Sequence, residues 1–327
     1  MGYHIARRLL QNGHEVILFN RGKTPDDFGD KIHRIHGDRC EYPSFQKKFK
    51  KDRFDVVIDM IAFKAEDSEA AVKTFLDKVS HFFHISTAAV YLLTRDYPCP
   101  LQERDFDRPL YPRPKEGSWW NYGYHKRKCE EVLSQAHKKS GFPVTALRLP
   151  IIMGERDYTL RAYSYFLRIQ DGKPLIIPDS GQNAFTHIYQ DDIVQTVAAN
   201  LLNETAYGQV YNLAQEEVLT LKLFVQKAAE IMERKVEMVD IPSDVLQNSG
   251  LGTSFSPFSM RRPFILDVRK AKEELGFSST PFAVWLRRTI HWFNQEYHGG
   301  PSEDYRTRQK EIEVIQKYRE AVQKIKD

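Results

Sequence analysis

The chain has 327 residues, of which 41% are hydrophobic and 28% are charged, and its formal net charge is +4. This length and composition predict a globular protein with one large or two modest domains. The small net charge gives no electrostatic reason to expect nucleic acid as a partner, although it does not oppose an anionic ligand.

The three cysteines, Cys40, Cys99 and Cys129, are widely spaced and form no CxxC pair. A disulfide framework or a zinc site is therefore not expected, and a reducing compartment fits best. The eleven histidines show no metal-binding spacing, so we expect no metal. No apolar run approaches the ~20 residues that cross a bilayer, and the first residues lack the apolar core of a signal peptide. We expect a cytoplasmic protein with no membrane partner.

Helical and strand-like patterns alternate from residue 2 to about residue 150. The apolar positions of the first segment predict a helix that ends at Asn12-Gly13. Helices are also predicted over 66–79 and 121–140, and strands over 15–20, 31–38, 55–63, 81–86 and 144–149. The runs over 15–20 and 55–63 are typical of buried strands, and the pattern over 31–38 is weaker. Strands separated by helices indicate βαβ units and a parallel sheet.

Beyond Pro150 the predicted elements are shorter and the loops are longer. The patterns predict helices over 159–171, 191–203, 220–234, 268–275 and 282–297, and strands near 175–177, 209–213 and 235–240. We expect a first domain over 1–150, a smaller lobe over 151–300 that returns in part to the sheet, and an amphipathic helix over 301–327. This last helix would dock on the body of the protein or on a second subunit.

Tyr122 and Lys126 lie four residues apart in the segment NYGYHKRKCEEVL. On a helix this spacing places both side chains on one face. An ammonium beside a phenol lowers the phenol pKa from its ordinary value of ~10, toward the range of a general acid/base. The alternative is a surface helix on which the same spacing arises by chance.

The strand predicted over 81–86 leads directly into Thr87. Open α/β sheets bind their ligands at the carboxyl ends of parallel strands. Thr87 is therefore a candidate to hydrogen-bond a substrate oxygen next to Tyr122. The alternative is a polar strand end that leads into a loop.

Six segments resemble, in chain order, those of extended short-chain dehydrogenases/reductases, the NAD-dependent epimerase/dehydratase family. They are ISTAAVY, NYGYHKRKCEEVL, LRLPIIMGERD, FTHIYQDDIV, VYNLA and DVRKAKEELGF. The resemblance implies an α/β fold with a Rossmann-type doubly wound parallel sheet. Residues 1–150 would bind NAD or NADP, and the smaller C-terminal lobe would bind the substrate.

The resemblance also implies an enzyme that acts on a nucleotide sugar. Tyr122 would be the catalytic acid/base, Lys126 would lower its pKa and bind the nicotinamide ribose, and Thr87 would orient the substrate. Hydride transfer from the sugar as Tyr122 takes the hydroxyl proton would give a keto intermediate. Hydride return to the other face would give an epimer, and elimination before return would give a dehydratase. Relatives that pair through the tyrosine helix make a homodimer the expected assembly.

The family's phosphate-binding fingerprint is a strand followed by GxxGxxG, and here only its end is recognisable. Gly2 resembles the third glycine, which allows a helix to pack closely on a strand. The first strand and two glycines, roughly 10 to 15 residues, are absent. We expect a truncated sequence, because the missing strand would lie in the middle of a 3-2-1-4-5-6 sheet and its loss exposes two neighbours.

The predicted second strand ends in Asn20-Arg21-Gly22-Lys23, without the acidic residue that favours NAD. Asn20 does not repel a 2′-phosphate and Arg21 attracts one, which favours NADP, unless this is simply a solvated turn. Gly37 and Asp38 resemble the family's adenine-contacting position. Two further residues, at the end of the 55–63 run, would line the cofactor cleft: Ile61 and Ala62.

Arg261 and Arg262 precede DVRKAKEELGF, where similar epimerases place an arginine on the nucleotide diphosphate. The alternative for both is an ordinary surface role.

Two other functions use the same fold. The NRGKTP and GDR segments also resemble the chloroplast stem-loop-binding branch, whose members bind RNA. The near-balanced charge argues against nucleic acid. A redox or nucleotide sensor without turnover has no need of the Thr87, Tyr122 and Lys126 set.

Overall fold

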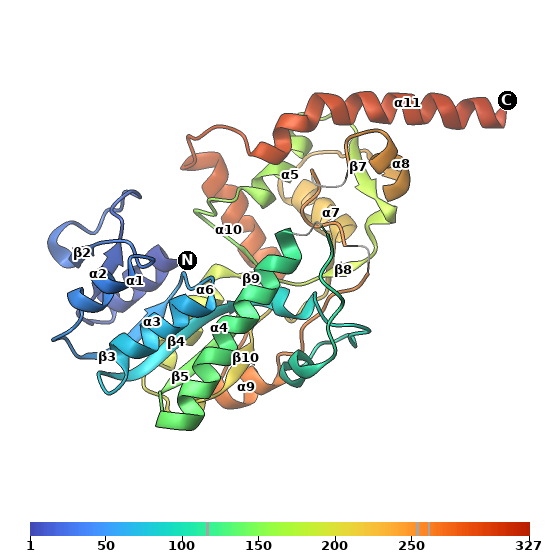
Figure 1. Ribbon diagram of the computed structural model, residues 1–327. Helices are drawn as coiled ribbons and strands as arrows, with labels where there is room; N and C mark the ends of the chain where they lie inside the picture. The colour runs from blue at the N-terminus through green and yellow to red at the C-terminus, as the bar shows by residue number, and fades with distance from the viewer. Residues whose placement is uncertain (116–117, 253–254, 261) are drawn as a thin grey trace. The chain divides into compact units, whose positions relative to one another are not determined.

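The computed structural model describes residues 1–115, 118–252, 255–260 and 262–327, and Figure 1 follows the chain from blue to red. The chain divides into two compact units. Unit 1 comprises Met1–Pro150, Gln190–Ala214 and Leu266–Ser278, and unit 2 comprises Ile151–Tyr189, Gln215–Ile265 and Ser279–Asp327. Unit 1 is therefore assembled from three stretches of sequence.

Unit 1 alternates strands and helices, as its sequence pattern predicts. Its helices are α1 (Gly2–Gln11), α2 (Tyr42–Lys48), α3 (Ala65–Phe75), α4 (Ser118–Ser140), α6 (Gln190–Ala199) and α9 (Arg269–Leu275). Its strands are β1 (Ile17–Asn20), β2 (His33–His36), β3 (Phe54–Asp59), β4 (Val79–Thr87), β5 (Val144–Leu149) and β10 (Val210–Asn212).

The strands of unit 1 form two parallel sheets. Among the residues that the structure describes, β1 pairs with β2 alone, whereas the other four strands lie in the order β10-β5-β4-β3. All six residues of β5 are buried, since this strand has a neighbour on each edge and α4 packs against it. α3 and α4 lie side by side, and α4 also contacts β4 and β5.

A cleft of about 920 Å³ in unit 1 is lined by residues of α1, β1 and β3, so that it borders both sheets. All four residues of β1 are half-buried, and in β3 only Asp59 is fully buried. We predicted buried strands over residues 15–20 and 55–63. Strands are present there, but the prediction that they are buried is wrong. Each strand has one paired edge, and its other side borders the cleft.

The helices of unit 1 are held by two apolar clusters. α1 packs through Ala6 against Val16, Phe28 and Ile32. Aromatic rings fill the layer between the four-stranded sheet and its helices, namely Phe45, Phe49, Phe75, Phe82 and Phe142.

Unit 2 has shorter elements, as its sequence predicts. Its helices are α5 (Arg161–Gln170), α7 (Leu221–Ile231), α8 (Ser243–Asn248), α10 (Phe282–Gln295) and α11 (Arg308–Lys326). Its strands are β6 (Ile151–Met153), β7 (Leu175–Pro178), β8 (Ala184–Phe185), β9 (His187–Tyr189), β11 (Leu219–Thr220) and β12 (Met238–Ile241).

The expected C-terminal helix is present as α11, and a buried ion pair docks it. Arg168 of α5 donates to Glu311 of α11 at 2.9 Å, and neither side chain is exposed to water. The Ile176 backbone N–H donates to the other Glu311 oxygen at 3.0 Å. The helix therefore docks on the body of its own unit. In the part of the chain that the structure describes, no helix is long and apolar enough to span a membrane.

Candidate active site

The helix α4 carries Tyr122 and Lys126 one turn apart, and a glycine sets its distance from β4. A Cβ on Gly123 would lie 2.6 Å from the Ala89 carbonyl oxygen, closer than a real Cβ approaches an oxygen. Ala89 belongs to the 3₁₀ turn Ala88–Tyr91 that directly follows β4. The bare glycine thus lets the turn of helix that begins with Tyr122 pack against the backbone at the carboxyl end of β4.

Tyr122 is 42% exposed. Its ring lies 6.4 Å from the ring of Phe63, which follows β3 and is itself half-exposed. The phenol is therefore accessible to a ligand from outside, as an acid/base has to be.

Lys126 is only 2% exposed, and its ammonium is held by backbone carbonyls. Its Nζ donates to the Ala62 oxygen and to the Ile85 oxygen, each at 2.8 Å. Burial lowers the pKa of Lys126. The ammonium therefore joins the carboxyl ends of β3 and β4, and two of its three protons are already engaged.

His84 of β4 lies next to this ammonium. Its Nε2 is 3.4 Å from the Lys126 Nζ, and its buried Nδ1 makes no hydrogen bond to any described residue. Burial, reinforced by the positive charge of Lys126, holds the pKa of His84 well below its ordinary value. The imidazole is therefore neutral, and Nε2 can accept the third lysine proton if Nδ1 carries the hydrogen.

Thr87 ends β4, and its Oγ1 accepts the Ala89 backbone N–H at 3.2 Å. The preceding Ser86 donates to Glu130 of α4. Arg148 of β5 pairs with the same carboxylate at 2.6 Å and also donates to the Tyr91 hydroxyl at 2.6 Å. This buried network fixes the register of α4 on the sheet. The pairing of Glu130 with Arg148 was not predicted, since nothing in a sequence pairs two residues on separate elements.

A second buried ion cluster lies beside the cleft and was not predicted either. Arg39 donates to Asp59 at 2.6 Å and lies 3.3 Å from Asp67, which accepts backbone N–H groups at the start of α3. Burial raises the pKa of Asp59, and the guanidinium of Arg39 opposes that shift. Arg39 and Asp59 both line the cleft. In the sequence, the one feature near this cluster that we had singled out is the segment Gly37-Asp38-Arg39, which contains Arg39 but does not indicate its carboxylate partners.

The residues predicted to bind the adenosine end follow β1 and β2. Asn20 accepts the Gly22 N–H through its side chain at 2.8 Å and the Gly37 N–H through its backbone oxygen at 3.0 Å. Asp38 accepts the Cys40 N–H at 2.9 Å. A Cβ on Gly37 would lie 2.7 Å from the Phe19 ring. These contacts hold the two strand ends together, and Arg21 between them is exposed.

Three other predicted cofactor residues lie in different surroundings. Gly2 and Ile61 line the cleft, and Ile61 is 48% exposed. Ala62 is fully buried. A Cβ on Gly2 would meet Met60 Cε at 4.0 Å, which is an ordinary contact. The close packing expected at Gly2 is absent from the described residues, because no strand lies beside it there.

Arg262 is half-buried in unit 2, and Arg261 lies outside the described residues.

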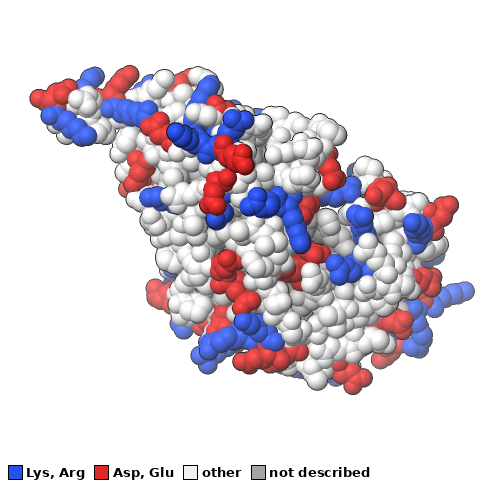
Figure 2. All heavy atoms as spheres, turned by 180° about the vertical axis from the view of Figure 1, so that it is seen from behind, with Lys and Arg blue, Asp and Glu red and all other residues white. Residues whose placement is uncertain are grey.

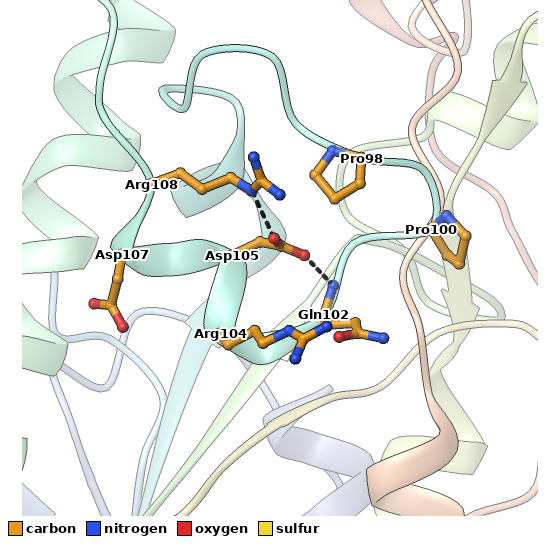
Figure 3. A pocket seen from close by; sticks show the side chains of 7 residues that line it. All are labelled: Pro98, Pro100, Gln102, Arg104, Asp105, Asp107 and Arg108. Carbon is orange, nitrogen blue, oxygen red and sulfur yellow. Dashed lines mark hydrogen bonds and ion pairs between the residues drawn. The ribbon is translucent and has the colours of Figure 1, made fainter.

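Figure 3 shows a second pocket of about 520 Å³, around the 3₁₀ helix Glu103–Asp107. Its buried Asp105 accepts from Arg108 at 2.6 Å and from the Gln102 backbone N–H at 2.8 Å. Because this carboxylate is already satisfied, we regard the end of β4, with α4, as the stronger candidate.

Parallel strands with helical crossovers, and polar groups gathered at their carboxyl ends, define a Rossmann-type α/β protein. Two solved structures show the same fold. UDP-glucose 4-epimerase from Thermotoga maritima, solved with UDP-glucose, is similar with a TM-score of 0.71 and 19% identity, over 90% of this chain and 95% of that one. UDP-glucuronic acid 4-epimerase from Bacillus cereus, in complex with NAD, has a TM-score of 0.69 and 19% identity, over 91% and 95%.

A curated relative is also similar in sequence. The chloroplast stem-loop binding protein of 41 kDa b from Arabidopsis thaliana is 28% identical over 294 residues, which cover 85% of this chain and 72% of that protein. The model of the NAD-dependent epimerase/dehydratase family matches residues 1–214. The chain belongs to this family of NAD-dependent enzymes.

Proposed function

We propose that the protein is an NAD(P)-dependent epimerase, dehydratase or reductase that acts on a nucleotide sugar, with Tyr122 as its acid/base. The observation that carries the proposal is that the exposed phenol of Tyr122 and the buried ammonium of Lys126 lie one helical turn apart on α4. The family match supports it, and so does the likeness to epimerases that bind UDP-glucose or NAD.

In this proposal the exposed residue transfers a proton and the buried residue supplies a fixed charge. Tyr122 is exposed to the substrate and exchanges a proton with a sugar hydroxyl. Lys126 holds a fixed positive charge that favours the phenolate. It would bind a ribose hydroxyl through the proton now directed at His84. Thr87 would orient the substrate oxygen, and the bound dinucleotide supplies the hydride chemistry.

The residues around Asn20 fit the adenosine end of a dinucleotide. Two adjacent strand ends are tied by the Asn20 and Gly37 contacts, with Asp38 and exposed Arg21 beside them. The absence of an acidic side chain at Asn20 favours NADP over NAD. We propose that Arg262, and Arg261 with it, contacts the substrate diphosphate, and that the enzyme is a homodimer.

The first prediction tests the phenol. Tyr122→Phe should lower turnover by about 10²- to 10⁴-fold, since it removes the proton-transfer group and leaves the ring in place. Cofactor affinity should stay within about threefold. Turnover is followed by product analysis on a panel of nucleotide sugars, and cofactor affinity by calorimetry.

Tyr124→Phe is the matched control for this experiment. Tyr124 lies on the same helix, stacked on Trp120 at 4.8 Å between ring centroids, and its variant should retain turnover. Wild-type turnover in Tyr122→Phe would contradict the proposed acid/base.

RNA binding is a second candidate, favoured by the likeness to the chloroplast stem-loop binding protein. Figure 2 shows lysine and arginine interspersed with aspartate and glutamate on the face it presents. That pattern lacks the single-sign basic surface of most RNA-binding proteins. A stem-loop RNA bound tightly at low salt and released steeply as salt rises would favour this candidate over the enzyme.

A further inference from the structure

Lys126 is a buried cation that is held by neutral groups. Its described hydrogen-bond partners are two backbone carbonyls and one imidazole, and none of them is a carboxylate. Burial lowers its pKa, and the carboxylates of Asp59 and Glu130 are among the groups that oppose this shift. Each of these carboxylates is already in an ion pair of 2.6 Å with an arginine. The charge of Lys126 therefore depends on its neutral acceptors.

The imidazole belongs to His84, and the register of the sheet places it beside the ammonium. His84 lies within β4, opposite Asp59 of β3 and Ala146 of β5. Residues opposite each other in a parallel sheet project from the same face, and the small side chain of Ala146 takes little of the space beside the ring. The imidazole is fully buried, and its Nε2 lies 3.4 Å from the Lys126 Nζ. The sheet thus fixes where this nitrogen lies.

The three contacts of the ammonium differ in length. The bonds to the Ala62 and Ile85 oxygens are 2.8 Å each, whereas the contact with His84 is 3.4 Å. The two short bonds go to the backbone, which cannot turn away. The long contact is the weakest of the three. It is therefore the one that the lysine exchanges most readily for an oxygen of a ligand.

The state of the His84 ring decides whether this contact is attractive. Burial, reinforced by the charges of Lys126 and Arg39, holds the pKa of His84 well below its ordinary value, so the ring is neutral. A neutral imidazole has one N–H and one acceptor nitrogen. With the hydrogen on Nε2, it would point at the protons of the ammonium. With the hydrogen on Nδ1, which makes no hydrogen bond to a described residue, Nε2 accepts from Lys126.

We propose that His84 is a positioning residue for Lys126, whose Nε2 accepts a hydrogen bond from the ammonium in the unliganded enzyme and gives it up to a ribose hydroxyl when the dinucleotide binds. The inference rests on the proposed function and adds a role for a residue outside the Thr87, Tyr122 and Lys126 set. His84 keeps the lysine charged before the cofactor arrives. It therefore acts on the capture of the cofactor, and not on the proton transfer that follows.

The pH dependence of cofactor capture follows from this role. Without its third acceptor, the buried ammonium is less well stabilised and loses its proton at a lower pH. A hydrogen bond to a charged group corresponds to about one to two pKa units. Other titratable groups also face the ammonium, and they stay unchanged when only His84 is replaced: Asp59, Cys129, Glu130 and Arg39.

His84→Met and His84→Gln form the matched pair for a kinetic test. Both side chains are unbranched and similar in length, but only glutamine offers an oxygen near the position of Nε2. For each protein, kcat/KM for NAD and for NADP, and kcat at saturation, are measured against pH with a nucleotide sugar that the original chain turns over. The first quantity reports the free enzyme, and the second reports the complex.

His84→Met should move the alkaline limb of kcat/KM to lower pH by about one to two units, whereas kcat should stay within about threefold. His84→Gln should restore the original limb, which a loss of packing alone would not do. His125→Gln, at an exposed position on the same helix, should leave the limb in place. An unmoved limb in His84→Met, or an equal shift in His84→Gln, would overturn the proposal.

Nitrogen NMR of the histidine side chains tests the same contact without turnover. The full chain is labelled with ¹⁵N-histidine, and the His84 signals are those that disappear in His84→Gln. We expect a neutral ring with its hydrogen on Nδ1 that does not titrate between about pH 6 and about pH 8. In Lys126→Met the hydrogen should move toward Nε2, since no ammonium faces that nitrogen any longer.

The inference and the proposed function fail in different ways. Turnover that persists in Tyr122→Phe contradicts the acid/base but leaves the state of the His84 ring unaffected. A hydrogen on Nε2 of His84 in the original chain would sink the inference, even if Tyr122→Phe is inactive. Because this last measurement needs no substitution at His84 beyond the assignment of its signals, it decides the matter even where His84→Met folds poorly.

Discussion

Lys126 shows how burial changes what a single side chain does. Its ammonium is anchored by the carbonyl oxygens of Ala62, which follows β3, and of Ile85, which lies near the end of β4. A lysine bound in this way cannot swing between partners, so it acts as a fixed charge. The same contacts make it a structural residue, because two buried carbonyls depend on it for hydrogen bonds.

Replacement of this lysine should therefore affect stability as well as activity. Lys126→Met keeps the side-chain volume but leaves the two carbonyls without their donor, and we expect a loss of about 1–3 kcal/mol in the free energy of unfolding. The measurement is denaturation by urea. Lys128→Met is the control on the same helix, since Lys128 forms a partly exposed pair with Glu131 that is worth about 0–1 kcal/mol. Equal losses in both variants, or a gain in Lys126→Met, would show that the carbonyl contacts are unimportant.

The helix α4 is the element on which the candidate site depends, and its position is set at two places. Gly123 meets the Ala89 carbonyl near its start, and Glu130 binds Ser86 and Arg148 two turns later. The contact at Gly123 limits how far α4 lies from the chain after β4, whereas the hydrogen bonds and ion pair of Glu130 fix its position along the sheet. Together they decide where Tyr122 lies relative to the end of β4.

Gly123→Ala tests this placement. In an exposed helix alanine is more stabilising than glycine by roughly 0.5–1 kcal/mol. Here the added Cβ would lie 2.6 Å from a backbone oxygen that cannot rotate away. We expect a destabilisation of about 1–3 kcal/mol, as for overpacked sites, and reduced turnover. Gly300→Ala is the control, because a Cβ there meets nothing within 4 Å. A stabilised Gly123→Ala protein would contradict the close packing of α4.

At the scale of the whole molecule, buried histidines couple stability to pH. Burial lowers the pKa of His81 to about 4 and that of His187 to about 3, both from 6.5. Neither ring nitrogen of His187 has a hydrogen bond to a described residue, and Phe185 and Trp285 are among its ring neighbours. Since these side chains are neutral when folded and protonate once unfolded, the unfolded state binds more protons below pH 6.5. The stability that these histidines contribute should therefore be fully present above pH 6.5. It should decrease as the pH falls from 6.5 toward the lowered pKa values of the folded state.

His187→Leu should make this dependence less steep. It removes one group that contributes up to about 1.4 kcal/mol per pH unit between its unfolded and folded pKa values. The free energy of unfolding is measured by urea titration at a series of pH values from about 7 to about 4.5. His298→Leu, at an exposed position, should keep the original slope. An unchanged slope in His187→Leu would mean that folding does not lower the pKa of His187.

Much of the secondary structure is determined by local sequence. The run Val144–Leu149 forms the predicted strand, and the predicted helix over 121–140 is found as α4. The strand predicted over 55–63 ends earlier, at Asp59, whose carboxylate accepts the Ile61 N–H and turns the chain. The spacing of Tyr122 and Lys126 was also evident, because helical periodicity is a local property.

Only the tertiary structure decides which residues become partners across the sheet. The pairing of Arg148 with Glu130, and of Arg39 with Asp59, joins side chains on separate elements, and no periodic pattern encodes such a choice. Burial is decided at the same level. β1 and β5 are similarly apolar in sequence, but β5 is covered on both edges whereas β1 borders a cleft. Local sequence sets the preferred backbone conformation, whereas the exposure of a strand depends on which neighbours the fold places beside it.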